Sequence, residues 1–141
     1  MKFNLEKSSG IRIHAYDPGI VTLALPSQLK CPKMAETDAD EPSLCRISHN
    51  IIISSKAIHQ HESPANYDEL GQQHINFALG FNPEIILLGT GDHIHFPAPQ
   101  LISLAANRGV GMEVMDTAAA CRTFNILVGE SRQVVAILLM N

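Results

Sequence analysis

Hydrophobic and polar residues alternate in two short segments near the start of the chain. Every second residue is apolar in IRIHAY, residues 11–16, and again in IVTLAL, residues 20–25. This period of two is typical of strands with one buried face. Between the segments lies the turn sequence DPG, in which proline fixes φ and glycine accepts a positive φ. The pattern therefore predicts a β-hairpin.

The middle of the chain is expected to hold a loop, a strand and a helix. Residues 27–43 are polar, contain two prolines and show no period, which indicates an exposed loop. Strand character resumes in LCRISHNIIIS, residues 44–54. Ser63 is then expected to cap a helix that has Pro64 in its first turn and ends at Gly80. Apolar residues recur at helical spacing along that segment, which predicts an amphipathic helix.

Strands and helices alternate from residue 84 to the end of the chain. The segment EIILLG, which begins there, is apolar almost throughout and predicts a buried parallel strand. The other expected elements are strands at 111–116 and 133–140 and helices at 97–109 and 117–128. This order is the pattern of right-handed crossovers with helices packed on a sheet. Residues 1–141 are thus expected to form a single domain, in which an N-terminal β portion joins a C-terminal α/β layer.

Length, composition and charge exclude several classes of protein. The chain has 141 residues, of which 45% are hydrophobic, and this suits one folded domain. Its net charge is -4, and its ten Lys and Arg residues form no basic run, so we expect no nucleic acid partner. The apolar runs are too short to cross a bilayer as helices, so we expect no membrane-spanning segment.

The N-terminus and the cysteines indicate the compartment. Residues 1–8 are polar and are expected to form a loose lead-in, without the apolar segment of a signal peptide. The three cysteines, Cys31, Cys45 and Cys121, are odd in number, widely spaced and form no CxxC motif. This arrangement predicts neither a disulfide framework nor a zinc knuckle. We therefore expect a soluble, cytoplasmic protein of bacterial type in a reducing compartment.

The sequence GTGD follows the buried strand and is the first candidate site. Ligands of open α/β sheets bind beyond the carboxyl ends of the strands. Backbone N–H groups of Gly89, Thr90, Gly91 and Asp92 could hold an anion there. The motif is neither GxGxxG nor a P-loop with its lysine. The alternative, which we favour, is a tight strand-to-helix turn in which Asp92 bonds its own backbone.

Three more residues are expected at the same end of the sheet. If the strands are parallel, Asp116 and Thr117 lie beside Asp92, and two carboxylates there could carry out acid–base chemistry or hold a cation. An ordinary helix N-cap is the favoured alternative. Cys121, in the first turns of the same helix, could be an activated thiol paired with a histidine. Its apolar neighbours favour a buried, inert thiol instead.

Two HxH pairs, His59/His61 and His93/His95, raise the question of a metal site. Residues two apart on a strand face the same side, so each pair could grip zinc if carboxylates or Cys121 supplied further ligands. Spacing alone shows neither the ligand count nor the geometry, and solvated loop histidines are the favoured alternative. We therefore expect no metal and no other cofactor.

Three segments of the chain resemble a known family. GIRIHAYDPGIVTLAL, EIILLGTGD and GVGMEVMDTAAACRTFNILVGESRQVVAIL are similar to small domains of unknown function, a family that includes mitochondrial respiratory complex I assembly factor three and the adipogenesis-associated Mth-domain protein. The resemblance covers residues 10–140 and is strongest over 84–137. It implies a three-layer, mixed α/β (α+β) fold, with the N-terminal hairpin or small sheet packed on a central mixed sheet with helices. The acidic exposed loop at residues 31–43, the histidines at 59–61 and the HIH sequence depart from the family pattern.

The resemblance implies no established activity, and the sequence contains no complete catalytic set. We interpret the chain as a non-enzymatic accessory or assembly-type protein that acts by binding another protein, similar to the family branch linked to complex I assembly. A small-molecule or anion-binding domain, or an unrecognised enzyme, is the alternative, and it would use the candidate residues around GTGD, Asp116, Thr117 and Cys121. A metal protein that uses the histidine pairs is the third interpretation. Self-association stays open.

Overall fold

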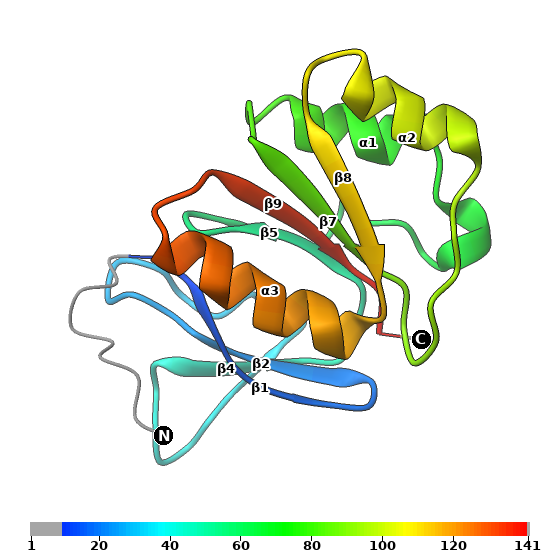
Figure 1. Cartoon of the computed structure of the whole chain (residues 1–141). Helices are drawn as coiled ribbons and strands as arrows, with labels where there is room; N and C mark the ends of the chain where they lie inside the picture. The colour runs from blue at the N-terminus through cyan, green and yellow to red at the C-terminus, as the bar shows by residue number, and fades with distance from the viewer. Residues whose placement is uncertain (1–9, 141) are drawn as a thin grey trace.

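The protein folds into two β-sheets and a set of short helices (Figure 1). The computed structural model describes residues 10–140, so the lead-in expected at residues 1–8 lies outside the described residues. The strands are β1 (Arg12–Asp17), β2 (Ile20–Ala24), β3 (Glu36–Thr37), β4 (Leu44–Ile47), β5 (Ile51–Ser54), β6 (Ile58–His59), β7 (Ile85–Gly89), β8 (Gly111–Met115) and β9 (Val134–Leu138). The helices are the short 3-10 helix η2 (Tyr67–Glu69), α1 (Gln72–Leu79), α2 (Pro99–Ala106) and α3 (Thr117–Gly129).

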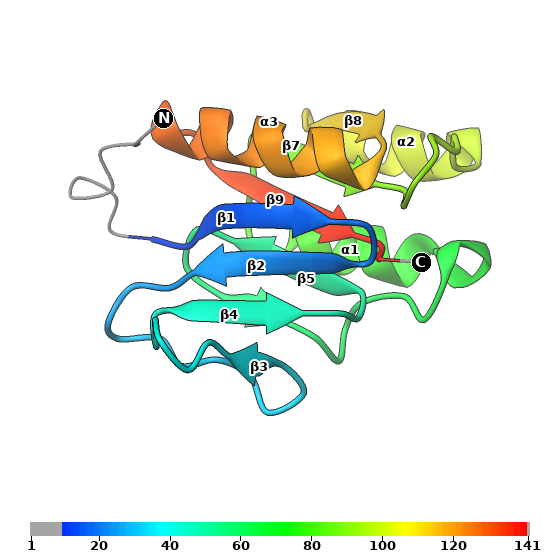
Figure 2. The same ribbon diagram turned by 90° about the horizontal axis from the view of Figure 1, so that it is seen from below.

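A mixed five-stranded sheet forms the middle layer. Its strand order is β6-β5-β9-β7-β8. β7 runs parallel to β8 and β9, as the apolar run predicts, whereas β5 runs antiparallel to β9. α1 and α2 lie on one face, and α3 lies on the other face together with the four-stranded sheet β1-β2-β4-β3 (Figure 1, Figure 2). The prediction of a three-layer α+β domain is confirmed.

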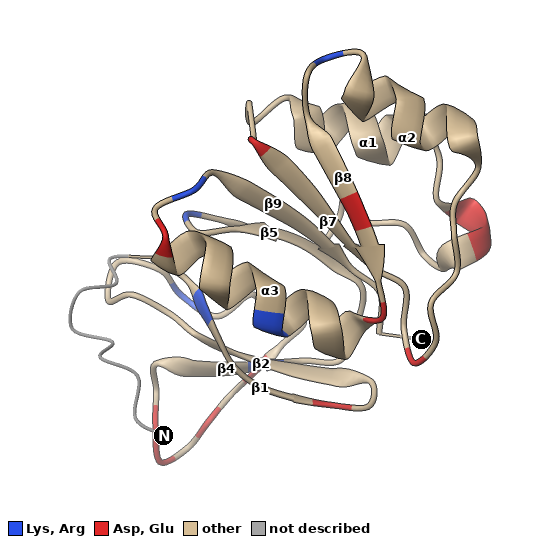
Figure 3. Cartoon of the chain, viewed as in Figure 1, with Lys and Arg blue, Asp and Glu red and all other residues tan. Residues whose placement is uncertain are grey.

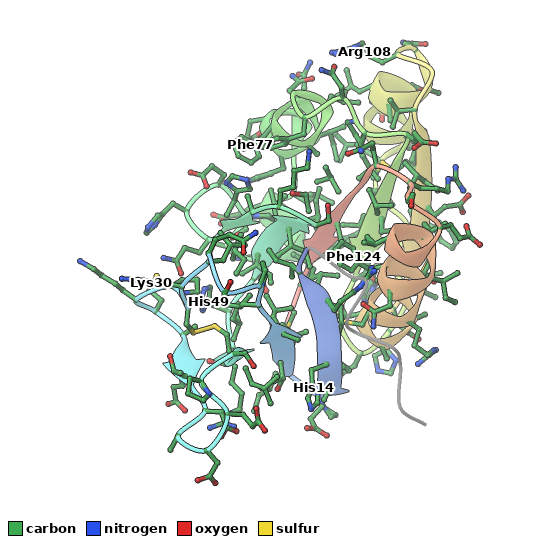
Figure 4. The ribbon with its side chains drawn as sticks, turned by 90° about the vertical axis from the view of Figure 1, so that its left-hand side faces the viewer. His14, Lys30, His49, Phe77, Arg108 and Phe124 are labelled. Carbon is green, nitrogen blue, oxygen red and sulfur yellow. A yellow bond between two sulfur atoms is a disulfide. The ribbon has the colours of Figure 1, made fainter. Side chains whose placement is uncertain are left out.

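Each face of the middle sheet has its own apolar core. Ile86 and Leu88 of β7 pack with α1 and α2, and Leu87 packs with α3 and the small sheet. Phe124 of α3 is fully buried in the second of these cores (Figure 4). Both faces of β7 are therefore covered, which is why its sequence is continuously apolar instead of alternating.

The helices that the structure describes are short. The longest is α3, with 13 residues, and crossing a bilayer takes about 20 apolar residues in a helix. Within residues 10–140, accordingly, no helix has the length and apolar character of a membrane span.

The predicted N-terminal hairpin is confirmed, and a helix closes its free edge. β1 pairs antiparallel with β2, and Gly19 takes a φ of 82° in the turn. β1 is an edge strand whose register is irregular between Ile13 and Ala15. Asn125 of α3 completes this edge: its Oδ1 accepts the Ile13 N–H and its Nδ2 donates to the Ile13 carbonyl, both at 2.8 Å. These two bonds attach α3 to the small sheet.

The strand character expected at residues 44–54 is confirmed, but it is divided between two strands, β4 and β5, which belong to different sheets. Asn50 is buried at the corner between them. Its Nδ2 donates to the carbonyls of Pro64 and Ala65 at 2.9 and 3.0 Å, and its Oδ1 accepts the Met140 N–H at 2.7 Å. The chain can therefore turn sharply at this point without leaving the buried amide unpaired.

The helix expected from Pro64 begins later, after Gly71. Ser63 does not cap it, because its hydroxyl donates to the carbonyls of Asn50 and Gln60 at 2.8 and 2.9 Å. Gly71 is the N-cap of α1, and its N–H donates to Nδ1 of His74 at 3.0 Å. The end of the helix at Gly80 is as predicted.

The cysteine prediction is also wrong, because Cys31 and Cys45 form a disulfide (Figure 4). Their Cα atoms are 5.6 Å apart. The pairing arises because the acidic loop at residues 31–43 folds back on the small sheet: β3 pairs with β4, and Arg46 forms an ion pair with Asp38 at 2.9 Å. Most of the loop is nevertheless exposed. The cysteine count thus gives no reason to assign a reducing compartment.

We expect reduction of the disulfide to lower the melting temperature of the protein. In the chain-entropy account, a crosslink that closes a loop of this length stabilises the fold by about 3 kcal/mol. Thermal unfolding with and without a reductant measures the effect. The Cys31→Ser variant is the control, because its melting temperature should not respond to the reductant. A wild-type melting temperature that the reductant leaves unchanged would contradict the pairing.

We expect Asn125→Ala to lower the free energy of unfolding by about 2 kcal/mol or more, because it leaves the N–H and carbonyl of Ile13 without their partner. Chemical denaturation measures this change. Asn76→Ala, at an exposed position of α1, is the matched control and should have a much smaller effect. Equal unfolding midpoints for the two variants would show that Asn125 does not fasten α3 to β1.

Candidate functional site

The parallel strands end at one side of the molecule, where their carboxyl ends come together. Gly89 of β7 is level with Met115 of β8 and Leu138 of β9. The turn of the β1–β2 hairpin lies at the same end, and a Cβ on Gly19 would be 3.6 Å from the Met140 carbonyl oxygen (Figure 1, Figure 2). We call this end the strand rim; it comprises residues 16–20, 89–96, 115–121 and 139–140.

Thr117 is the central polar residue of the strand rim. Its side chain is fully buried. Its Oγ1 accepts the N–H of Gly91 at 2.8 Å and donates to the Leu139 carbonyl at 2.7 Å. The backbone N–H of Thr117 donates in turn to the Gly91 carbonyl at 2.9 Å. The N–H of Gly91 is thus already paired within the protein, and it does not point to an anion.

Thr90 closes the turn that follows β7. Its N–H donates to the Met115 carbonyl at 2.9 Å. Its Oγ1 donates to the His93 carbonyl at 2.6 Å and accepts the His95 N–H at 3.1 Å. Thr90, and not Asp92 as expected, therefore supplies the side chain that orders the turn. This pattern supports the strand-to-helix turn as the interpretation of GTGD.

The two glycines of GTGD have steric roles. A Cβ on Gly89 would lie 3.0 Å from both Cα and Oγ1 of Thr117 and 3.1 Å from Cβ of Ala120. Gly89 therefore allows α3 to approach β7 closely. Gly91 has a φ of 94°, a conformation that side chains with a Cβ rarely adopt.

Asp116 is the N-cap of α3. Its carboxylate accepts the N–H of Ala119 at 2.8 Å, and its backbone is extended, as at an ordinary cap. The structure places Asp116 and Asp92 on the same side of the molecule, because the strands that precede them are parallel. The capping bond accounts for the position of Asp116 without a ligand.

Tyr16 belongs to the strand rim, although the sequence gives no sign of it. Its hydroxyl is buried and forms no hydrogen bond of good geometry among the described residues, although the backbone N–H of Gly19 lies near it. Burial raises the pKa of the phenol, the backbone N–H of Gly19 opposes this shift, and Asp92, Cys121 and Asp116 raise the pKa further. Asp92, Cys121 and Asp116 thus lie close enough to the phenol of Tyr16 to influence its pKa. Only the packing of the hairpin against the sheet brings them together.

Cys121 is unsuited to nucleophilic chemistry. Its side chain is 2% exposed. Burial raises the pKa of the thiol to about 12, although Arg122 acts in the opposite direction. The thiol is protonated at neutral pH, whereas the reactive form of cysteine is the thiolate. The structure therefore supports a buried, inert thiol.

The histidine pairs take different environments. His93 and His95 are exposed on the turn after β7, and the ring of His95 packs against Tyr67 at 5.2 Å between centroids. His59 is half-buried between Phe77 and Phe81, at 5.1 and 5.0 Å, so it is not the solvated loop residue that the sequence favours. Across residues 10–140, no group of three or more potential ligands comes together to hold a metal ion.

An open hollow of about 250 Å³ lies at the opposite end of the middle sheet. Its walls come from Ser54–Ala57, Phe81, Pro83 and Gln133–Val135. It is lined partly by Val134 and Val135 at the start of β9, whereas the strand rim lies beyond the end of that strand. The hollow therefore includes none of the candidate site residues.

We expect the thiol of Cys121 to be silent in the folded protein. At about pH 8, Ellman's reagent should label almost no thiol in the native chain, because the group is buried and its pKa is raised. In denaturant without reductant one thiol per chain should react, since Cys31 and Cys45 are paired. Rapid labelling of Cys121 in the native protein would restore the activated-thiol hypothesis.

Three comparisons relate the chain to known proteins. Over 93 residues it is 31% identical to the 13 kDa major membrane protein of Francisella tularensis, covering 65% of this chain and 76% of that protein. It is 45% identical over 56 residues to the NADH dehydrogenase (ubiquinone) 1 alpha subcomplex assembly factor 3 of Xenopus tropicalis, covering 40% of this chain but only 31% of that factor. A Bordetella parapertussis protein of known crystal structure superposes with a TM-score of 0.73 at 28% identity, covering 96% of this chain and 99% of that one.

The match to a family extends over most of the chain. Residues 40–139 match the family described as a protein of unknown function, DUF498/DUF598. This segment contains β4 to β9, the GTGD turn, Asp116 and Cys121. The resemblance seen in the sequence is therefore confirmed, and the chain belongs to the DUF498/DUF598 family.

Proposed function

We propose that this protein is a non-enzymatic accessory protein of the assembly-factor type, and that it binds another protein at the strand rim. The observation that carries the proposal is a pair of exposed apolar side chains, Ile94 and Phe96, which are 51% and 71% exposed. Large apolar groups exposed close together are characteristic of interaction sites. The similarity to assembly factor 3 favours the same class of function, in which the partner would belong to an NADH dehydrogenase.

The loop that bears these two side chains is ordered by hydrogen bonds. The hydroxyl of Tyr67 donates to the Phe96 carbonyl at 2.6 Å, and Thr90 bonds the backbone of His93 and His95. Exposure of Ile94 and Phe96 is thus fixed by neighbouring elements. A pre-ordered loop loses little conformational entropy when a partner binds, which favours recognition.

The chemical state of the strand-rim residues disfavours the enzyme alternative. The thiol of Cys121 is protonated, the N–H groups of Thr90 and Gly91 are paired internally, and the carboxylate of Asp116 caps a helix. Covalent catalysis needs an activated nucleophile with a nearby base, and these residues do not supply that arrangement.

A small-molecule site at the strand rim is the second candidate, and the buried hydroxyl of Tyr16, which lacks a well-formed hydrogen bond, favours it. A buried hydroxyl without a well-formed hydrogen bond is unusual in a folded protein. With Asp92 and Asp116 nearby, such a site would suit a polar ligand that is neutral or cationic. The same carboxylates would repel an anion, so the anion-binding version of this alternative is disfavoured.

We expect an Ile94→Ser/Phe96→Ser variant to lose the physiological partner. The full-length chain would be expressed with a tag in its own organism and captured under native conditions, with quantitative mass spectrometry as the readout. Ile126→Ser is the matched control, because Ile126 is 60% exposed on α3, away from the loop. The wild-type and Ile126→Ser chains should enrich the same protein, and the double variant should not.

The opposite pattern would favour the second candidate. The proposal fails if no protein is enriched reproducibly while a small polar molecule raises the melting temperature of the wild-type chain. Loss of that thermal shift in Tyr16→Phe would assign the molecule to the strand rim.

A further inference from the structure

The strand rim and its neighbour η2 carry unbalanced negative charge. The carboxylates at this end of the molecule are Asp17, Asp68, Glu69, Asp92 and Asp116. None of them belongs to the ion pairs found within residues 10–140. Figure 3 shows these red segments at the hairpin turn, at η2, in the loop after β7 and at the start of α3. Most blue segments lie elsewhere, and the nearest one is on α3.

The exposed apolar side chains of Ile94 and Phe96 have carboxylates on either side of them. Ile94 and Phe96 follow Asp92 in the loop after β7, and the carbonyl of Phe96 is bonded to Tyr67, which immediately precedes Asp68 and Glu69. Carboxylates therefore flank the apolar pair on both sides. Ile20, which is 39% exposed, adds a third apolar group beside Asp17 at the hairpin turn.

We infer that the strand rim docks a positively charged segment of its protein partner, one that carries apolar side chains between Lys and Arg residues. The apolar side chains of that segment would cover Ile94 and Phe96, and its cations would meet the surrounding carboxylates. This inference rests on the proposed protein-binding function and specifies the partner surface.

Charge complementarity selects this occupant. A second copy of the chain docked through the same face would place these carboxylates against an identical set, which costs free energy. An anionic lipid surface would be repelled for the same reason. A basic segment is attracted over long range, and this attraction raises the association rate. Added salt screens the attraction and lowers the rate again. Aromatic groups near the centre of such a surface usually contribute most of the affinity.

The probes are two synthetic amphipathic peptides of equal length, one built from Leu and Lys and the other from Leu and Glu. Each is titrated into the isotope-labelled full-length chain and followed by NMR. The Leu–Lys peptide should shift the signals of residues 17–20, 67–69 and 92–96, and added salt should weaken its binding. The Leu–Glu peptide should bind at least about tenfold more weakly.

Variants separate the apolar and charged contributions. Phe96→Ser should weaken binding of the Leu–Lys peptide by about tenfold. The loop should stay ordered, because the backbone carbonyl of residue 96 can still accept the hydrogen bond from Tyr67. Asp17→Asn/Asp92→Asn should weaken binding of the same peptide and reduce the salt dependence of that binding. The controls remove matched groups elsewhere: Ile126→Ser for the apolar change, and Asp40→Asn/Glu130→Gln for the two charges. Both controls should bind like the wild-type chain.

Several results would overturn the inference. The two peptides could bind equally well, the NMR shifts could be confined to other faces, or the control variants could weaken binding as much as the rim variants do. A dimer in sedimentation that Phe96→Ser abolishes would indicate a second copy of the chain as the occupant. Binding to phosphatidylglycerol vesicles that depends on Phe96 would indicate a lipid surface. If the peptide test fails while native capture still depends on Ile94 and Phe96, the protein-binding function stands and only the basic partner is rejected. If capture fails and the peptide test succeeds, the rim recognises basic apolar sequence but the assembly-type function loses its support.

Discussion

The hydroxyl of Thr117 joins three elements at one point, and the geometry of the strand rim depends on it. It accepts the N–H of Gly91 beyond β7 and donates to the carbonyl of Leu139 beyond β9, while Thr117 itself begins α3. Because the side chain is fully buried, water cannot replace a lost partner, and an unpaired group there would cost about 1–3 kcal/mol. Gly89 permits this close approach, since a Cβ at that position would lie only 3.0 Å from Cα and Oγ1 of Thr117. A hydrogen bond and a missing methyl group together fix α3 against the sheet.

Two asparagines, the buried Asn50 and the half-buried Asn125, connect the remaining layers by the same principle. Asn50 holds the backbone of Met140 and the segment that leads to η2, whereas Asn125 holds the free edge of β1. Each amide uses both its oxygen and its nitrogen on backbone groups that no strand partners. Such bonds specify one arrangement of the elements, because an apolar residue of similar size would leave the backbone groups unpaired. The loop with Ile94 and Phe96 is therefore presented by a frame whose internal polar groups are largely satisfied.

Local sequence patterns predict the elements whose burial or turn geometry is encoded in their own residues. β7 is continuously apolar because helices and the small sheet cover its two faces, and the DPG turn needs the positive φ that Gly19 adopts. Patterns fail where a distant residue decides the structure. The corner between β4 and β5 depends on Met140, and the pairing of Cys31 with Cys45 depends on the path of the acidic loop. Tyr16 has the pattern of one more residue in an alternating strand, and only after the hairpin packs on the sheet do Asp92 and Asp116 come close enough to influence its pKa.

The strand rim shows why a glycine turn at a strand end is weak evidence for an anion site. An anion needs several unpaired N–H groups and a favourable potential. In GTGD, the N–H groups of Thr90 and Gly91 already donate hydrogen bonds to Met115 and Thr117. Nearby carboxylates also make the electrostatic potential at the turn unfavourable for an anion. Protonation of Cys121 removes thiolate chemistry from the same region. What remains available at the surface is apolar area on an ordered loop within a field of negative charge. These are the properties by which a protein surface gains affinity through desolvation and selectivity through charge.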